Sequence, residues 1–462
     1  MWIDTGDQAV TFAAAERMAG QLLSYLRTLG FQRGDVVALD LPPTLHAVFT
    51  VALFRLGAIS CAYPRLVVQG SFSCNWLISA SVTESPVAEH TLYLASHNIS
   101  LIDELEPIEA TDPLQHDEDF RLIFSSGTTG KPKPIAVSSD LMAQRADHSV
   151  ATRPAGSSYF CALDFSTTAG LRTLLWCLRE GLSYLVPGDG GRNLAQMKRH
   201  LVDVATMSPD QMRTLLQAAE SAGEHLPALH SVVYAGSFLD PKLAERFRNW
   251  FGVKLFTSLG STEAGIITVR PYESDDSSDV GYIVDDLEFE IVDENDQPLP
   301  TGTVGKIRYR RPRDPVEYFR DPDATARVFR HGWCYPGDLG ELTDDGRLLL
   351  RGRADDLVNV GGVKVDPSIF DPVAREVIGV TDAAGFSFRE PNGSEVLAVA
   401  VVTTFGFREQ ELLDALAQAF GTRQPTVVVQ IEAIPKTATG KTMRSELATL
   451  VEQGLAATPP TT

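Results

Sequence analysis

The 462-residue chain contains 40 Lys and Arg against 60 Asp and Glu, a formal net charge of −20, and apolar residues make up 44% of it. That apolar content excludes intrinsic disorder, and 36 Gly and 27 Pro without a regular period exclude collagen-like and coiled-coil architectures. The acidic balance argues against nucleic acid or an anionic membrane as a partner, because either would be repelled overall. At about 150 residues per domain, the length predicts two to three domains.

The five cysteines are far apart and never form a C-x-x-C pair: Cys61, Cys74, Cys161, Cys177 and Cys334. Their odd number and spacing predict reduced, mostly buried thiols rather than disulfides or a metal site. No segment reaches the roughly 18 consecutive apolar residues that a membrane-spanning helix needs. The first residues lack the basic and apolar regions of a signal peptide, so we expect a cytoplasmic enzyme without a membrane span.

The first half of the sequence alternates helix and strand patterns. Apolar residues at helical spacing predict a helix over residues 11–29, capped by Thr11, and a short apolar run predicts a buried strand over residues 36–39. A second helix is predicted over residues 46–56, after which Gly57 turns the chain into the next strand. This alternation favours parallel or mixed sheets covered by helices, so we predict an α/β fold.

From about residue 285 the pattern changes to short strands separated by Gly and Asp turns, over residues 287–292, 305–309 and 347–351. These strands predict a small antiparallel, barrel-like portion. A compact α+β segment of about 100 residues follows Gly352, which is the size of a small domain. We therefore expect a large N-terminal domain over residues 1–352 and a small, mobile C-terminal domain over residues 353–462.

The strongest chemical motif is Phe-Ser-Ser-Gly-Thr-Thr-Gly-Lys-Pro-Lys at residues 124–133, directly after a strand pattern. Its two glycines allow a tight turn in which backbone N–H groups and hydroxyls converge on a phosphate. A solvated hairpin is the alternative, since Ser, Thr and Gly are common in turns. The spacing of these lysines does not fit a Walker A loop. In a second candidate, residues 435–442, Pro435 stands where the first glycine would be, which argues against a P-loop NTPase.

Five segments resemble motifs of the adenylate-forming superfamily, in the same order and spacing. This superfamily includes acyl- and aryl-CoA synthetases, the adenylation domains of peptide synthetases and firefly-type luciferases. The resemblance extends from about residue 11 to residue 447 and is carried by residues 126–133, 260–263, 337–338, 352–356 and 435–441. It implies ATP-dependent activation of a carboxylic acid to acyl-AMP, with release of pyrophosphate.

The resemblance implies that one loop and one turn surround the triphosphate. Thr262 would contact the α-phosphate region and take part in catalysis with Glu263, which would hold Mg²⁺. The loop would order around the β- and γ-phosphates through Ser126, Gly127, Thr128, Thr129, Gly130 and Lys133.

The nucleoside would be bound further along the chain. By the same resemblance, Ala235, Gly236 and Ser237 would run along the adenine, and Asp338 with Arg353 would bind the ribose. A carboxylate suits a ribose because it accepts hydrogen bonds from two hydroxyls.

Three positions of the C-terminal part match moving or channel-lining residues of the family. Asp355 matches the hinge, and Lys441 matches the catalytic lysine that swings in to meet the carboxylate and the α-phosphate. Two anions meet in this step, so an ammonium placed where charge builds up lowers the barrier. Gly362 matches the position that leaves room for the thiol arm of CoA, because a Cβ would narrow the channel. A hairpin turn is the alternative for this Gly-Gly pair.

The acid pocket is expected near Asp164, Phe165, Tyr234 and Gly260. In amino-acid-activating relatives an Asp in a similar context pairs with the ammonium of the substrate, which suggests an amino-substituted acid. The alternative is that Asp164 caps a helix beginning at Phe165 or faces solvent. The aromatic side chains favour an aryl or short acid over a long chain.

Four places depart from the family pattern: Pro134, Leu259, Ser139, which stands where the family often has His, and residues 163–170, which replace its aromatic–His stretch. Pro134 follows the phosphate loop where the family usually has glycine, and Leu259 stands where an aromatic ring usually stacks on adenine. These changes are expected to lower the affinity for ATP, but they remove no group that stabilises charge.

The sequence therefore predicts an acid–thiol ligase that uses ATP and Mg²⁺ and transfers the acyl group to CoA. Three alternatives stay open. The enzyme would load a carrier protein, or it would join the acid to an amine or other nitrogen acceptor, or the chain would be a non-catalytic relative that only binds the nucleotide.

Overall fold

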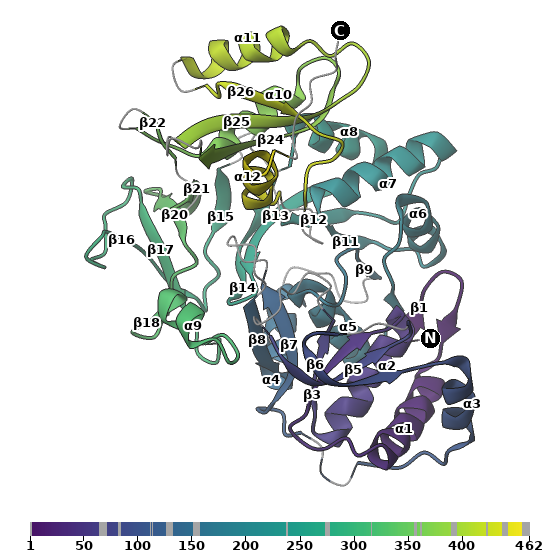
Figure 1. Cartoon of the computed structure of the whole chain (residues 1–462). Coiled ribbons are helices and arrows are strands. Elements are labelled where there is room, and N and C mark those ends of the chain that lie inside the picture. The colour runs from purple at the N-terminus through teal and green to yellow at the C-terminus, as the bar shows by residue number, and fades with distance from the viewer. Residues whose placement is uncertain are drawn as a thin grey trace.

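The computed structural model describes residues 2–63, 72–81, 85–110, 112, 114–125, 133–150, 158–236, 239–272, 278–315, 317–354, 358–360, 363–389, 395–421, 424–436 and 442–454. Figure 1 shows the N-terminal region at the bottom, a second sheet above it, an antiparallel sheet at the left and the C-terminal part on top.

The N-terminal sheet has six strands in the order β6 (Ala88–Tyr93), β5 (Cys74–Ser79), β3 (Val36–Asp40), β4 (Ile59–Ala62), β7 (Asp119–Ser125) and β8 (Lys133–Ser138). Neighbouring strands are parallel except β7 and β8, which form an antiparallel pair with Ser125 opposite Lys133. The predicted phosphate loop, residues 126–132, therefore connects two paired strands.

The second sheet has five strands in the order β14 (Gly265–Pro271), β13 (Lys254–Ser261), β12 (Ser231–Ala235), β11 (Val204–Met207) and β9 (Tyr159–Cys161). All pairs are parallel except β13 with β14. The helices of this region are α5 (Thr168–Glu180), α6 (Gly190–Arg199), α7 (Pro209–Ala222) and α8 (Pro241–Phe251). Because carboxyl ends of parallel strands meet at one edge, the segments that follow β11, β12 and β13 lie side by side.

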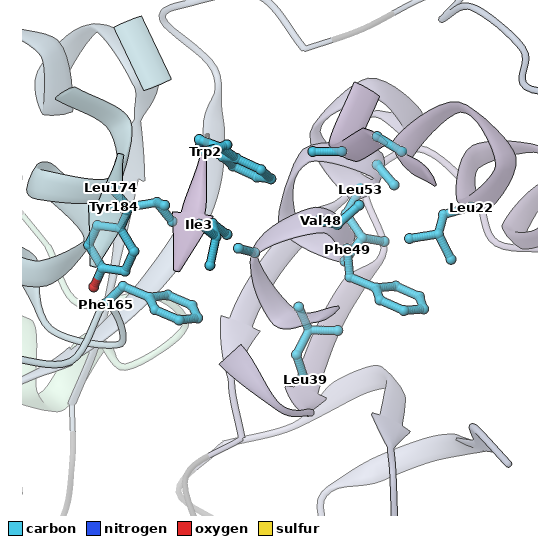
Figure 2. Close-up of a cluster of buried hydrophobic side chains, with 14 of the residues drawn as sticks. Trp2, Ile3, Leu22, Leu39, Val48, Phe49, Leu53, Phe165, Leu174 and Tyr184 are labelled. Carbon is cyan, nitrogen blue, oxygen red and sulfur yellow. The ribbon is translucent and has the colours of Figure 1, made fainter. Parts of the chain in front are cut away.

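A shared core joins the first two sheets. The short strands β10 (Tyr184–Leu185), β1 (Ile3–Asp4) and β2 (Ala9–Val10) pair with one another, so the N-terminus is joined to the region that contains the second sheet. Helices α1 (Phe12–Thr28) and α2 (Pro43–Leu56) bury their apolar faces against this junction, as Figure 2 shows. The remaining helices of the N-terminal region are α3 (Ser96–Glu104) and α4 (Ser139–Val150).

The third sheet is antiparallel throughout. Its strands follow the order β15 (Asp279–Tyr282), β21 (Arg347–Arg353), β20 (Asp338–Leu342), β17 (Gly305–Arg310), β19 (Trp333–Cys334) and β18 (Phe329–Arg330), and β16 (Glu288–Val292) pairs with β17. Helix α9 (Pro322–Val328) precedes β18. This sheet matches the antiparallel portion that the Gly- and Asp-rich pattern predicts.

The C-terminal part contains a hairpin and a separate sheet. The hairpin consists of β22 (Val358–Val360) and β23 (Val363–Val365), and the sheet has the order β24 (Val380–Arg389), β25 (Glu395–Thr403) and β26 (Val427–Gln430). Its helices are η1 (Pro367–Ile369), α10 (Phe370–Arg375), α11 (Glu409–Phe420) and α12 (Arg444–Glu452). Two apolar clusters formed by residues of this part alone give it its own core, which supports the proposed division of the chain near residue 353.

The mixed α/β fold predicted from the sequence is confirmed. The first helix begins after the predicted cap, where the Thr11 hydroxyl accepts a hydrogen bond from the Ala14 N–H at 3.2 Å. The second begins earlier than predicted, at Pro43, because proline is well tolerated in the first turn of a helix. All five cysteines are described and buried, and none of them forms a disulfide. Within the described residues, no helix combines the length and apolarity needed to cross a bilayer.

Candidate active site

The turn between β13 and β14 carries Thr262 and Glu263 at the edge of the second sheet. The register of the two strands shifts between Leu259 and Gly260, so the chain bulges just before the turn. A Cβ on Gly260 would lie 2.6 Å from the carbonyl oxygen of Gly265, closer than real Cβ contacts come. Gly260 is therefore needed for the shape of the turn itself, in addition to its predicted place near the acid.

Two buried arginines hold this turn by its backbone. Arg145 of α4 donates to the carbonyl oxygens of Thr262 at 3.0 Å and Glu263 at 2.5 Å, and Arg311 donates to that of Ala264 at 2.7 Å. Arg145 also pairs with the buried Asp314 carboxylate at 3.0 Å, which supplies a counter-charge. No local motif marks either arginine for this site, because their carbonyl partners lie 47 to 118 positions away in the sequence.

The side chain of Glu263 is hydrogen-bonded to Tyr318, a residue that no sequence motif predicted for the site. The Tyr318 hydroxyl donates to Oε1 of Glu263 at 2.7 Å. Burial, followed by the Glu263 carboxylate, raises the pKa of Tyr318, so this hydroxyl keeps its proton and stays a donor. No sequence motif around Tyr318 indicates that it contacts Glu263, which lies 55 positions away.

Tyr318 also joins Glu263 to the strands that flank the phosphate loop. The Lys133 ammonium lies 5.3 Å from the centre of the Tyr318 ring, and the side chain of Ser125 is a hydrogen-bonding neighbour of Tyr318. The next residue, Phe319, donates its N–H to the carbonyl oxygen of Pro134 at 2.7 Å. The unusual Pro134 thus contributes an acceptor that fixes the segment containing Tyr318.

The protonation of Lys133 depends on its burial and on the nearby Glu263 carboxylate. Burial lowers the pKa of the Lys133 ammonium, and the Glu263 carboxylate offsets part of that effect. A half-buried lysine beside a carboxylate is suited to receive a phosphate, because each additional negative charge restores the charged form of the ammonium.

The residues of the site fit a magnesium ion that is bound mainly by its substrate. Among the described residues, no group of three or more His, Cys, Asp or Glu side chains could hold a metal. Glu263 is a single carboxylate beside a lysine, and Mg²⁺ bound to phosphates takes only one or two protein carboxylates and keeps several waters.

Asp338 and Arg353, both predicted to bind the ribose, form an ion pair with each other. They stand opposite each other in the antiparallel pair of β20 and β21, and Arg353 Nη1 lies 2.8 Å from Asp338 Oδ1. Arg353 also donates to the carbonyl oxygen of Pro336 at 2.7 Å, and the Ala354 N–H donates to that of Gly337 at 2.8 Å. The Gly337–Asp338 turn is therefore fixed to the strand that leads into the C-terminal part.

The end of β12 adjoins the turn of Glu263. Ala235 pairs with Ser258 of β13, and Gly236 follows with a φ of 98°, a left-handed conformation that favours glycine. Tyr234 packs edge-on against Tyr272 with ring centres 5.9 Å apart, and its burial raises the pKa of its hydroxyl. Ala235, Gly236 and Glu263 thus lie along one edge of the sheet.

The predicted acid-binding pair occupies a turn before α5. Asp164 is exposed, and its Oδ1 accepts the Ser166 N–H at 2.8 Å. The helix begins at Thr168 with Thr167 as its cap, so Asp164 does not cap a helix beginning at Phe165. Phe165 lies in the shared core (Figure 2) and packs on His46, with ring centres 4.8 Å apart.

Several predicted site residues lie outside the described residues: Ser126, Gly127, Thr128, Thr129, Gly130, Ser237, Asp355, Gly362 and Lys441. Their roles stay predictions.

Comparisons with known proteins agree on one family. A family model described as AMP-binding enzyme matches residues 75–314. A fatty acid–acyl-carrier-protein ligase of Mycobacterium marinum is 28% identical over 380 residues, 74% of this chain and 70% of that protein. A 3-hydroxybenzoate–CoA/4-hydroxybenzoate–CoA ligase of Thauera aromatica is 27% identical over 349 residues, 72% of this chain and 66% of that protein.

Solved structures share the fold. The crystal structure of ATP-bound MatB from Rhodopseudomonas palustris superposes with a TM-score of 0.83 at 22% identity, covering 98% of this chain and 95% of that one. At this identity the likeness concerns the fold alone.

Proposed function

This chain belongs to the AMP-binding enzyme family, and we propose that it activates a carboxylic acid with ATP to form acyl-AMP and pyrophosphate. The acyl group is then transferred to a thiol, for which CoA is the first candidate. The matched stretch covers about two thirds of the two relatives above, so the activity of the whole protein is inferred from the site rather than taken from their names.

One observation carries the proposal: Glu263, Tyr318 and Lys133 converge between the two sheets. A carboxylate and an ammonium beside a Ser/Thr/Gly-rich hairpin provide what a magnesium triphosphate needs, namely one metal ligand and one positive charge. A site built for an uncharged ligand would leave this half-buried ammonium without a function.

The first step is the attack of a carboxylate oxygen on the α-phosphorus of ATP, and pyrophosphate leaves. Mg²⁺, when bound by Glu263 and the phosphate oxygens, supplies positive charge that reduces the repulsion between the two anions. Lys133 neutralises the charge that builds up on the leaving pyrophosphate. Asp338 accepts hydrogen bonds from the ribose hydroxyls and thereby orients the α-phosphate, while Arg353 holds the carboxylate of Asp338.

In the proposed reaction the C-terminal part supplies a further positive charge, the ammonium of Lys441. In our proposal Lys441 contacts both the carboxylate and the α-phosphate, and its loop approaches by rotation about Asp355. The second step is the attack of a thiol on the acyl carbonyl of acyl-AMP, and AMP leaves. Gly362 leaves room for the thiol arm in that step.

The acid is proposed to be aryl or short. Tyr234 stands at the end of β12, one position before the predicted adenine-binding segment, and offers a ring to one side of the pocket. Phe165 is packed into the core, so its ring is held in place before any acid binds. An exposed Asp164 with only a backbone donor on Oδ1 remains able to pair with a substrate ammonium. Equal adenylation rates for matched amino and desamino acids would remove that role.

The acyl acceptor is proposed to be a thiol, and the enzyme is proposed to be cytoplasmic. The relatives above include one protein named for a carrier-protein acceptor and one named for CoA, so both thiols are candidates. An amine acceptor and a non-catalytic nucleotide-binding role are the further alternatives. We place the enzyme in the cytoplasm, in keeping with cysteines that form no disulfide.

One assay separates these alternatives. Pyrophosphate release is measured with ATP and Mg²⁺ across a panel of aryl, short, fatty and amino acids, with and without CoA, a pantetheine-bearing carrier protein or an amine. We expect acid-dependent pyrophosphate release and thioester formation with CoA. Release with transfer only to the carrier or the amine would assign that acceptor, whereas nucleotide binding without any acid-dependent release would overturn the proposal. Glu263→Gln, which keeps the size but removes the charge, serves as the matched inactive control.

A further inference from the structure

Arg121 of β7 is a buried cation whose three hydrogen-bond partners are all uncharged groups. Its Nη1 donates to the hydroxyls of Ser60 at 3.2 Å and Thr50 at 3.3 Å, and its Nη2 donates to Nε2 of His46 at 3.1 Å. Its Nε is buried and has no hydrogen-bond partner among the residues that the structure describes. The guanidinium is therefore held by strand β4 and helix α2, with no carboxylate among these partners.

Such a charge is costly to bury. Buried charges normally pair with an opposite charge, as Arg145 does with Asp314 at 3.0 Å. Burial lowers the pKa of Arg121 to about 10, although the Cys61 thiol and the Asp164 carboxylate act to raise it. The guanidinium is therefore still charged at neutral pH. An ionised group retained at such a cost, close to a predicted binding segment, is typical of a functional site.

His46 receives the hydrogen bond from Arg121 as a neutral ring. Burial, followed by the Arg121 cation, holds the pKa of His46 well below its usual range. A guanidinium can only donate, so Nε2 of His46 is the acceptor and the ring proton lies on Nδ1. The imidazole therefore stays neutral at physiological pH, and the hydrogen bond fixes the orientation of its ring.

The oriented imidazole supports the predicted acid-binding turn. The rings of His46 and Phe165 meet edge-on with centres 4.8 Å apart, and Phe165 is only 3% exposed. Figure 2 shows the Phe165 ring pointing toward the side of the core that Phe49 of α2 occupies. Because Phe165 directly follows Asp164, its buried ring fixes the turn in which Asp164 is exposed. Arg121 thus connects strand β7 to the turn that is predicted to contact the acid.

We propose that Arg121, through its hydrogen bond to His46, is a positioning residue that holds Phe165 and its turn in place for binding of the acid. This inference rests on the proposed function, which places Asp164 and Phe165 at the acid pocket. The contact joins the first sheet to a turn of the region that contains the second sheet. Its loss would let that turn shift, and a displacement of about 1 Å is enough to weaken the positioning of a substrate.

Pyrophosphate-release kinetics of the full chain, with the acid and ATP varied separately, test this role. Arg121→Met keeps an unbranched side chain but leaves Nε2 of His46 without its donor. We expect KM for the acid to rise about tenfold, with KM for ATP unchanged. A general disturbance of β7 would raise both constants, because this strand pairs with β8, which begins at the proposed phosphate-binding Lys133.

Ser60→Ala is the matched control on the same arginine. It removes the acceptor that lies 3.2 Å from Nη1 of Arg121 and leaves the bond from Nη2 to His46 in place. Its KM for the acid should therefore equal that of wild type. A rise as large as that of Arg121→Met would show that any loss around the guanidinium has this effect, and it would overturn the role of the His46 bond.

His46→Phe and the double variant test the same bond from its other side. His46→Phe keeps a ring beside Phe165 but removes the acceptor of Arg121, so KM for the acid should rise here too, even where Arg121→Met is too unstable to assay. If the two residues act through each other, the double variant should raise KM no further than the larger single change.

Three results would overturn the inference: a wild-type KM for the acid in His46→Phe, parallel rises of KM for the acid and for ATP, or single effects that multiply in the double variant. A wild-type enzyme without acid-dependent pyrophosphate release would instead overturn the proposed function, so the two failures are distinguishable.

Discussion

The Tyr318 hydroxyl donates a 2.7 Å hydrogen bond to the Glu263 carboxylate across 55 positions of sequence. The same tyrosine lies beside Lys133, so one aromatic residue orients both the proposed metal ligand and the proposed phosphate-binding lysine. Arg145 donates to the carbonyl oxygens of Thr262 and of Glu263 itself, and Arg311 donates to that of Ala264. The carboxylate is thus fixed through its side chain and its backbone before any ligand binds.

Tyr318→Phe removes the hydroxyl and keeps the ring. We expect the Mg²⁺ concentration for half-maximal pyrophosphate release to rise about tenfold, because a hydrogen bond to a charged group is worth about 1.5–3 kcal/mol and Glu263 loses its orienting donor. The measurement is a Mg²⁺ titration at saturating ATP and acid. Tyr309→Phe, which removes a hydroxyl 2.9 Å from Ser261 at the same turn but not in contact with Glu263, is the control. An unchanged titration for Tyr318→Phe would remove its orienting role.

As the pH rises, the affinity for ATP should begin to fall at a lower pH than it would if Lys133 were exposed to solvent. Burial holds the pKa of Lys133 below its ordinary value in the free enzyme, and the bound triphosphate raises it again. Binding is therefore strongest below the pKa of the free enzyme and weakens as the pH rises through it. KM for ATP, measured against pH, should begin to rise below the usual lysine range near pH 10.4. Lys133→Arg keeps its charge, so its profile should be flat there; parallel profiles would contradict this assignment.

Arg145→Met should destabilise the fold and the site together. It leaves Asp314 as a nearly buried carboxylate with Arg311 3.9 Å away, and it frees the carbonyl oxygens of Thr262 and Glu263. Breaking a buried pair on one side costs about 3–5 kcal/mol. Chemical denaturation measures this loss. The double variant with Asp314→Asn should recover part of it, and a double variant no more stable than Arg145→Met would show that the pair contributes little.

Gly260→Ala should inactivate the enzyme more than it unfolds it. The added methyl group would meet the Gly265 carbonyl oxygen at 2.6 Å, so the turn that carries Glu263 must shift. We expect pyrophosphate release to fall at least about 100-fold, since a shift of about 1 Å at a reacting group has effects of this size. Gly191→Ala, near the start of α6, is the control for stability, because its Cβ would make only an ordinary 3.5 Å contact with Asp189. Wild-type activity in Gly260→Ala would show that the turn tolerates the shift.

The sequence predicted the family, the mixed fold and the class of acid-activating ligase, and the comparisons confirm all three. Short motifs also marked Asp338 and Arg353, which stand opposite each other in adjacent strands; their role at the ribose stays a prediction.

It failed where a role depends on distant packing. Arg145 and Tyr318 act through partners that are 55 or more positions away, and no local pattern marks an arginine that binds carbonyl oxygens of another segment. For Asp164 the sequence left open, besides a role at the acid, a helix cap or a place facing solvent. The structure excludes the cap, because Thr167 caps α5, and leaves Asp164 exposed in the turn before that helix.

The most direct measurement follows the two half-reactions of Lys441→Ala separately, with pyrophosphate and AMP quantified as products. We expect acyl-AMP formation to fall at least about 100-fold, because the variant removes a positive charge that meets the transition state. Transfer from supplied acyl-AMP should proceed at a rate near that of wild type. Equal collapse of both half-reactions, or turnover of ATP to ADP without AMP, would contradict a mobile lysine that joins two anions.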